Sequence, residues 1–324
     1  MSYTIKNLSE LPKDFIIDEN LKGSEYSIGN NIEIPLILEN IFKYKKSYLF
    51  FYNNDIIEAF FFGSIIDNKF VSHPHLSYGG ILVSDKFKLE NYKISKIFDQ
   101  IEIRSFEKIT KLNSQDKVCS ILKLDSEPLK QLSSFKYNIR RQIRVSSEKG
   151  VVIKSGNLNL LEDFYNVYSK SMHKLGSPPQ PKYFFKYFLE NWVNGEAMIF
   201  CAYHNDKPVA SSFALSYSNV LESCWAGSLH EYNKYFTMYL LYWEMIKKSI
   251  EKKYRFFSFG RSSPESGSLR FKNHWKPQTM ELYRNQLYFN KGSIKDLKFI
   301  NNILRSSPIF INNLLGKIFT KHIY

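Results

Sequence analysis

The stretch "AMIFCAYHNDKPVASSFALSYSNVLESCWAG", residues 197–227, decides the fold class. Its apolar and aromatic runs are interrupted by Asn205-Asp206-Lys207-Pro208, a cluster of turn-forming residues. We therefore predict three antiparallel strands over 197–204, 208–217 and 220–226.

The residues on either side of these strands predict alternating helices and strands. Phe236, Leu240, Trp243, Ile246 and Ile250 lie three or four positions apart, which indicates a helix over 234–252. Further helices are predicted over 127–149, 158–173 and 181–193, with strands over 151–155, 255–260 and 280–288 and a short helix between the last two strands. The predicted fold class is therefore α+β (mixed α/β).

The N-terminal part reads as a separate, smaller lobe. Two aromatic runs, 48–52 and 56–62, flank Asn53-Asn54-Asp55 and predict a hairpin. Pro74 and Gly79-Gly80 indicate a loop over 72–83, a helix is expected around 88–99, and strands are expected over 101–106 and 118–124. We place the domains at 1–125, at 126–290 and, for a basic amphipathic helical tail, at 291–324.

Charge points to phosphate-bearing partners. The chain of 324 residues has a net charge of +14, which attracts nucleic acid, nucleotide cofactors or anionic membranes. On the 127–149 helix, Lys136, Arg140 and Arg144 recur every four residues, as in a phosphate-binding rail or a solvated face. The tail, interrupted at Pro308, is either a packed helix pair or an amphipathic segment that contacts anionic lipid.

The sequence indicates no metal site and no secretion signal. Cys119, Cys201 and Cys224 are far apart, and His73 and His75 have no neighbouring carboxylate or cysteine partners. The N-terminus lacks an apolar signal region, and no apolar run reaches about 18 residues. We expect a cytoplasmic protein, with peripheral contact to the inner face of the cytoplasmic membrane as an open alternative.

The stretch "FSFGRSSPESGSLRFKNHW", residues 257–275, carries the candidate chemistry. A strand that ends at Gly260 and continues into a hydroxyl-rich loop exposes backbone amides and side-chain donors to a negative charge. Lys272 is the candidate for stabilising an oxyanion, and Arg261 for holding a phosphate or carboxylate of an acceptor. His173 is a candidate proton acceptor.

These residues resemble a known family. The 257–275 stretch, "YSKSMHKLGSPPQPKYFFKYFLE" at 168–190 and "LSYGGIL" at 76–82 are similar to FemAB-like, or BioF2-like, acyltransferases of the GNAT superfamily, especially those found near bacterial exopolysaccharide clusters. The resemblance implies two GNAT-like lobes, of which the C-terminal one has a complete mixed sheet flanked by helices. It also implies substrate contacts by Arg261, Ser262, Phe271, Tyr78, Gly79, Trp225, Tyr232, Tyr235, Tyr242, Arg140 and Arg144.

The implied activity is transfer of an acyl or aminoacyl group to the amine of a cell-envelope precursor. The donor would be a co-substrate, aminoacyl-tRNA or acyl-CoA, with no tightly bound cofactor. The acceptor would be a nucleotide- or lipid-linked amino sugar or peptide, and DNA is not an expected partner. Two alternatives stay open, an acetyl-CoA-dependent sugar N-acetyltransferase and a non-catalytic basic module that binds RNA or membranes.

Two departures from the family pattern affect these expectations. Relatives commonly have Phe-Asp-Phe-Gly-Arg-Ser where this chain has Ser258 in place of the Asp, so a carboxylate is missing there. The segment "AGSLHEYNKYF", residues 226–236, lacks the glycine-rich loop that holds the pyrophosphate of CoA in many GNAT enzymes, which argues against ordinary CoA binding.

Overall fold

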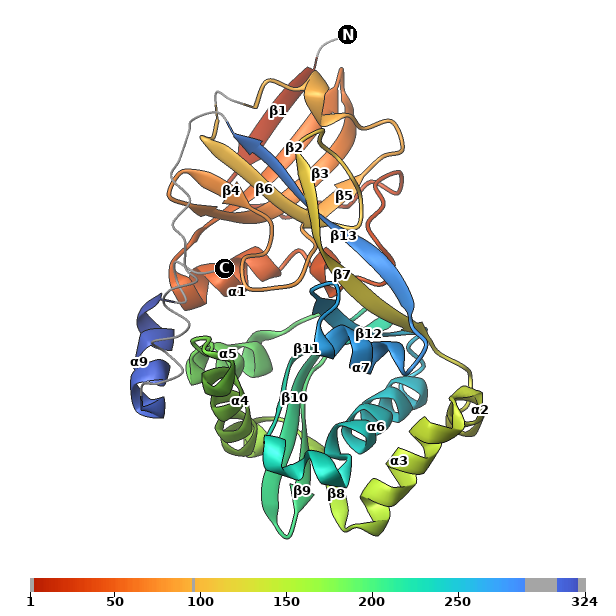
Figure 1. The fold of residues 1–324 in the computed structure, drawn as a ribbon. Helices are drawn as coiled ribbons and strands as arrows, with labels where there is room; N and C mark the ends of the chain where they lie inside the picture. Colours follow the sequence, from red (N-terminus) through yellow and green to blue (C-terminus); the bar gives the residue numbers. More distant parts are fainter. Residues whose placement is uncertain (1–2, 95–96, 289–307, 320–324) are drawn as a thin grey trace. The chain divides into compact units, whose positions relative to one another are not determined.

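The computed structural model describes residues 3–94, 97–288 and 308–319. Within them the chain forms two compact units (Figure 1). Unit 1 contains the chain up to Cys119, Arg261–Ser266 and the strand residues from Thr279 onward, whereas unit 2 contains Ser120–Gly260, Gly267–Gln278 and the C-terminal helix.

Unit 2 is built on a sheet with the strand order β12-β11-β10-β9-β8. The strands are β8 (Val151–Gly156), β9 (Ala197–His204), β10 (Lys207–Tyr217), β11 (Val220–Ser228) and β12 (Phe256–Ser262). Strands β8 to β11 pair antiparallel, whereas β11 and β12 run parallel. Strands β9, β10 and β11 confirm the three strands predicted at 197–226. The prediction succeeds here because the apolar pattern and the turn residues both indicate strands joined by tight turns.

Helices cover both faces of this sheet (Figure 1). On one face α4 (Leu161–Leu175), preceded by η4 (Leu158–Leu160), and α5 (Lys182–Asn191) bring Phe164 and Phe185 against Phe213 of β10. On the other face α6 (Thr237–Glu251), preceded by η5 (His230–Tyr235), packs in one buried cluster with Ala214, the neighbour of Phe213. Adjacent strand residues point to opposite faces, so the sheet is buried on both sides.

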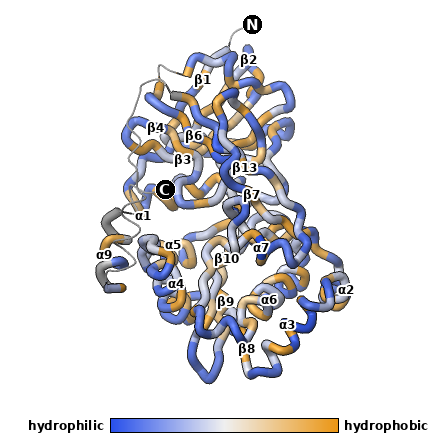
Figure 2. Tube along the Cα trace, viewed as in Figure 1, coloured by the Kyte–Doolittle hydropathy of each residue, from blue (hydrophilic) through white to orange (hydrophobic). Residues whose placement is uncertain are grey.

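The predicted helix over 127–149 is two helices in the structure. Helix α2 (Pro128–Ser134) ends at Phe135, whose ψ of 153° is extended, and α3 (Tyr137–Glu148) begins after Lys136, which is also extended. The break turns the Phe135 ring into the core, 5.1 Å from the ring of Trp275. Helix α3 packs on α6 and is mostly hydrophilic along its length (Figure 2).

Unit 1 contains the strand order β1-β2-β3-β4-β6-β13, with β5 paired to β3. Its strands are β1 (Tyr3–Leu8), β2 (Lys45–Asn53), β3 (Ile56–Ile66), β4 (Lys69–Val71), β5 (Ile81–Val83), β6 (Gln100–Ser105) and β13 (Gln278–Tyr288). The β2–β3 pairing confirms the hairpin predicted at 48–62. The helical elements are α1 (Ile34–Phe42), η1 (Ile28–Asn30) and η2 (Leu89–Asn91), so in the described part of 88–99 the expected helix is wrong except for this single turn.

The chain passes between the units several times. Strand β7 (Asn113–Lys123) leads from unit 1 into unit 2, β12 enters unit 1 at Arg261, and α7 (Gly267–Asn273) lies in unit 2 before β13 returns to unit 1. In place of the single boundary expected at 125/126, the first crossing follows Cys119, and further crossings come after it at 260/261, 266/267 and 278/279. Of the expected tail, the structure describes residues 308–319, which include α9 (Ile309–Phe319).

Candidate active site

The central feature of unit 2 is the point where β11 and β12 part. Their pairing covers three residue pairs and ends at Glu222 opposite Ser258, although β11 continues to Ser228 and β12 to Ser262. One residue further, the register of β10 and β11 shifts next to Ala214, which leaves Cys224 as an extra residue in β11. A bulge bends its strand, so the two parallel strands part here and β11 continues without β12 as its partner.

A buried polar chain lies at this divergence. Glu222 is 1% exposed, and Ser258 Oγ donates to Glu222 Oε2 at 3.1 Å. The same Oγ accepts the backbone N–H of Gly260 at 3.1 Å. Gly260 has a φ of +69°, and a Cβ there would lie 3.1 Å from Ser223 O, so the turn favours glycine.

Lys272 completes this chain. It is on α7 and is 7% exposed, and its Nζ donates to Gly260 O at 3.0 Å. A buried ammonium group requires hydrogen-bond partners, and this carbonyl fixes its position. Lys272 is thus bonded to the Gly260 carbonyl, and Glu222 is linked to the Gly260 N–H through Ser258.

A cavity of about 590 Å³ opens next to α7, at the start of α6. It is lined by Ser228 at the end of β11, by Thr237 and Tyr239 of α6, by Phe271 of α7 and by Gln142 of α3. No side chain caps α6, and Phe236 precedes it in a left-handed conformation. The N–H groups of the first turn of a helix attract anions.

Two polar atoms at this cavity have no hydrogen-bond partner among the described residues. Thr237 Oγ1 belongs to a fully buried residue, and Gln142 Oε1 is also buried. The Tyr239 phenol has two partners: it is hydrogen-bonded by the Gln142 side chain and lies 2.9 Å from His274 Nδ1. Burial raises the pKa of the Tyr239 phenol, which therefore stays protonated at neutral pH. The two unsatisfied atoms indicate a polar ligand in this cavity.

Residues 133–273 match the family described as Acetyltransferase (GNAT) domain. The chain carries a GNAT domain. The match begins in α2 and ends at the last residue of α7, so the divergence of β11 and β12, Glu222 and Lys272 all lie within the GNAT domain.

Solved structures extend this result to the fold of most of the chain. FemX has a TM-score of 0.60 at 9% identity, over 80% of this chain and 92% of that chain. A tandem GNAT protein from the clavulanic acid biosynthesis pathway has a TM-score of 0.52 at 7% identity, over 83% and 91%. The C-terminal domain of a putative lysylphosphatidylglycerol synthetase from Agrobacterium fabrum has a TM-score of 0.52 at 9% identity, over 81% and 89%. The chain therefore has the tandem GNAT-like, mixed α+β fold that its sequence predicts. No curated protein sequence matches it.

Several predicted site residues lie in the GNAT domain away from Lys272 or inside its core. Tyr242 is 4% exposed and packs on Phe259 and Phe271, and Trp225 packs edge-on against Phe184 and Phe185. Both rings have a packing role here. Only Phe271 is both next to Lys272 and on the wall of the cavity.

Others lie on surfaces of the same domain. Tyr235 stacks on His204 at 4.2 Å, with Tyr232 beside it at 6.0 Å. Arg140 and Arg144 are exposed on α3, and His173 lies partly buried in the last turn of α4. These predicted residues belong to η5, α3 and α4, whereas Lys272 belongs to α7.

The remaining predicted residues belong to unit 1. Arg261 is exposed. Burial lowers the pKa of His75 to about 3, and the positive charges of Arg104 and Arg261 contribute to this shift. Ser262 is buried, and Tyr78 is 1% exposed, with its hydroxyl accepting from Cys119 Sγ at 3.5 Å. Gly79 packs directly on the backbone of Gly29, where an added Cβ would lie 2.4 Å from Gly29 Cα.

Sequence reasoning missed Glu222 and Thr237. The signal for Glu222 is a single carboxylate within the apolar run "VLESCWAG", and Glu222 stands opposite Ser258 in the strand register. A buried carboxylate thus lies next to Ser258, on the neighbouring strand. Thr237 gives no such signal, because its burial depends on how η5 and α6 pack.

Among the described residues, no group of three or more His, Cys, Asp or Glu side chains is placed to hold a metal ion. Within the same residues, no helix is long and apolar enough to cross a membrane.

Proposed function

We propose that this protein is an N-acyltransferase that moves an acyl or aminoacyl group from an activated donor to the amine of a cell-envelope precursor. The observation that carries the proposal is the buried hydrogen-bonded chain around Gly260, at the point where β11 and β12 diverge. Lys272 donates to Gly260 O, the Gly260 N–H donates to Ser258 Oγ, and Ser258 Oγ donates to Glu222. A GNAT domain and an overall FemX-like fold support the reaction class.

The two charged groups have complementary roles in amide formation. The acceptor amine must lose a proton as its nitrogen attacks the donor carbonyl, and the carbonyl oxygen becomes an oxyanion. The Lys272 ammonium group stabilises this oxyanion more than the neutral carbonyl. Glu222 accepts the amine proton, directly or through Ser258, and the donor's thiol or hydroxyl leaves with a proton.

The donor would lie along the edge of β11 and reach the cavity at α6. Beyond Glu222 the edge of β11 no longer pairs with β12, and a strand edge of this kind can hydrogen-bond an extended amide-containing chain. The first turn of α6 and Thr237 Oγ1 would hold a donor phosphate. Acyl-CoA and aminoacyl-tRNA both carry such phosphates, and this arrangement offsets the missing glycine-rich loop.

The acceptor would be recognised through an anionic group. Arg261 directly follows Gly260 in the chain and is exposed, and a guanidinium group binds phosphate or carboxylate with two hydrogen bonds. A nucleotide- or lipid-linked amino sugar or peptide has both the anion and the amine. One structural neighbour is named a putative lysylphosphatidylglycerol synthetase, and that name is consistent with aminoacyl transfer to a lipid-linked acceptor.

The test combines purified protein with amino-sugar nucleotide acceptors and one of two donors, acetyl-CoA or a total tRNA aminoacylation mixture, and detects products by mass spectrometry. The proposal predicts a mass increase of the acceptor with one donor and none with Lys272→Met protein. The absence of product with both donors and with lipid-linked acceptors would contradict it. Salt-sensitive RNA or vesicle binding that persists in Lys272→Met protein without product would favour the non-catalytic alternative.

A further inference from the structure

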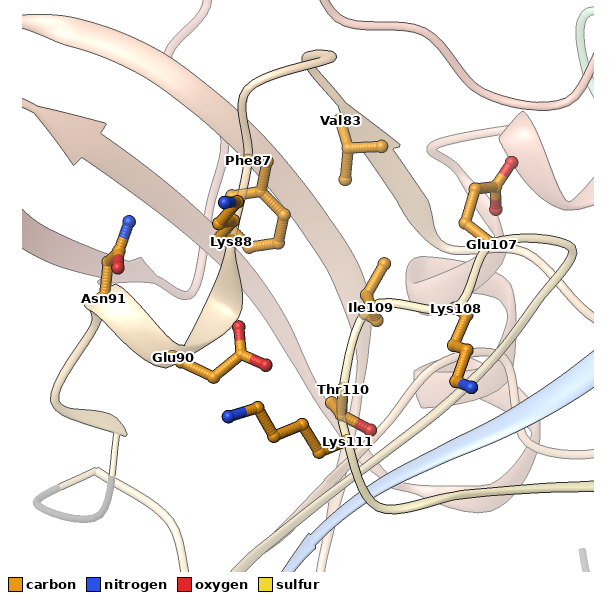
Figure 3. Close-up of a pocket in the computed structure, with 10 residues that line it drawn as sticks. All are labelled: Val83, Phe87, Lys88, Glu90, Asn91, Glu107, Lys108, Ile109, Thr110 and Lys111. Atoms are coloured by element: carbon orange, nitrogen blue, oxygen red, sulfur yellow. The ribbon is translucent and has the colours of Figure 1, made fainter.

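Unit 1 contains a cavity of about 830 Å³ that is independent of the GNAT-domain site (Figure 3). It is formed by two segments, 83–91 after β5 and 107–111 between β6 and β7. Figure 3 shows the Glu90 side chain of the first segment and the Lys111 side chain of the second extending toward one another. The volume lies within the range of about 300 to 1,000 Å³ typical of small-molecule sites.

The Asn285 side chain fixes the backbone of the second segment by hydrogen bonds. Asn285 of β13 is 1% exposed, and its Oδ1 accepts the N–H of Ile109 at 3.0 Å and of Thr110 at 3.4 Å. Its Nδ2 donates to Ser105 Oγ at 3.1 Å and to Glu107 O at 2.9 Å. A loop whose backbone is fixed by a fully bonded buried amide presents its side chains in defined positions, as binding loops do.

The rim of the cavity carries exposed charged side chains. Lys88, Lys108, Lys111 and Glu90 are exposed, and none of the four forms an ion pair or side-chain hydrogen bond with another described residue. Burial raises the pKa of Glu107, a fifth charged residue of the lining. Three ammonium groups attract an anion, and the carboxylates can accept hydrogen bonds from hydroxyl groups.

The floor of the cavity is apolar. Phe87 packs edge-on against Phe51 at 5.4 Å and Phe61 at 5.6 Å, so its ring is fixed by the core of unit 1. Val83 and Ile109 are partly buried beside the same core cluster. An aromatic ring with aliphatic neighbours accommodates the C–H face of a ring-shaped ligand.

We propose that this unit 1 cavity binds a phosphorylated saccharide. The three lysines of the rim, Lys88, Lys108 and Lys111, attract its phosphate. Its hydroxyl groups donate hydrogen bonds to Glu90 and Glu107, and one ring face rests on Phe87. A simple anion uses the lysines and leaves the carboxylates and the apolar floor without a role. The inference does not depend on the proposed acyl transfer, because the two sites belong to different units.

The test measures binding to the full-length protein by isothermal titration calorimetry with three probes: N-acetylglucosamine 1-phosphate, N-acetylglucosamine and inorganic phosphate. The sugar phosphate should bind at least tenfold more tightly than either of the other two. The K108A/K111A double variant should lose at least tenfold in affinity for it. The K86A/K93A variant removes two exposed lysines outside the lining of the cavity and should bind as the wild type does.

Glu90→Gln separates saccharide recognition from simple attraction of anions. If Glu90 accepts a hydrogen bond from the sugar, the variant binds the sugar phosphate severalfold more weakly, whereas inorganic phosphate binds equally well or more tightly. Tighter binding of both probes, or equal binding of inorganic phosphate and sugar phosphate by the wild type, overturns the proposal. Absence of sugar phosphate binding, or an equal loss in K86A/K93A, overturns it as well. Because all readouts are binding constants, failure of the acyltransferase assay leaves this test unaffected.

Discussion

At the residue scale, Lys272 is the group on which the proposed chemistry depends most directly. Its side chain is 7% exposed and hydrogen-bonded to Gly260 O, so its position is fixed before substrate binds. Lys272→Met keeps the length of the side chain and removes the charge. We expect kcat to fall by a factor of about 100 to 1,000, with little change in KM, because the interaction is strongest in the transition state.

The control for this prediction is Lys186→Met, which removes an exposed lysine of α5 that forms an ion pair with Glu190. It should leave kcat unchanged. Circular dichroism of both variants checks the fold. Equal activity of Lys272→Met and wild-type protein would show that Lys272 is a structural residue.

A second prediction at this scale concerns Ser258, because buried Glu222 lies next to it and disfavours a carboxylate at position 258. Ser258→Asp places a second carboxylate beside buried Glu222, and two like charges at this distance repel in a low-dielectric interior. We expect the free energy of unfolding to fall by about 3 kcal/mol. Urea denaturation measures this loss.

A double variant distinguishes charge repulsion from loss of shape. In Ser258→Asp/Glu222→Gln only one carboxylate remains, so most of the lost stability should return. If the double variant is no more stable than Ser258→Asp, steric strain next to Gly260 is the cause instead of charge.

At the element scale, the first turn of α6 determines how the donor binds. Thr237→Val replaces the buried Oγ1 with a methyl group of similar size, and the helix stays intact. We expect the KM of the donor to rise by a factor of about 3 to 10, the value of one hydrogen bond, with kcat unchanged. Steady-state kinetics with varied donor concentration tests this, and an unchanged KM with a lower kcat would contradict it.

Elements were predictable where local patterns and tertiary packing agree. The strands of 197–226 combine apolar runs with clear turn residues, so they appear in the structure as predicted. The break between α2 and α3 contains neither Gly nor Pro, and it forms because Phe135 packs into the core against Trp275. Such a tertiary contact leaves no local signal. Lys272 could be selected from the sequence, because it lies close to Gly260 along the chain. That Glu222 pairs with Ser258 could be known only from the register of β11 and β12.

At the scale of the whole molecule, acid should weaken the fold through two buried histidines of unit 1. Burial lowers the pKa of His73 to about 4, and burial with the charges of Arg104 and Arg261 lowers that of His75 to about 3. Histidine in an unfolded chain has a pKa of about 6.5. Between these values the unfolded chain binds more protons, so the free energy of unfolding falls as the pH drops from about 6.5 toward 4 and is fully retained above that range.

Urea denaturation at pH 7.5 and pH 5 measures this effect. Each histidine contributes up to about 1.4 kcal/mol per pH unit within the window. His73→Gln keeps a donor for Gly29 O, which lies 2.8 Å from the histidine Nε2, and it should reduce the difference between the two pH values. The same stability at pH 7.5 and pH 5 would show that the two rings become accessible to protons without unfolding.

The return of β13 to unit 1 has a consequence for folding during synthesis on the ribosome. Unit 1 lacks the strand that pairs with β6, and the Asn285 that fixes its 105–110 segment, until the chain has been synthesised past residue 285. Domains usually mature in the order in which they emerge. Here unit 1 can complete its sheet only after the GNAT domain has been translated, although most of unit 1 is synthesised first.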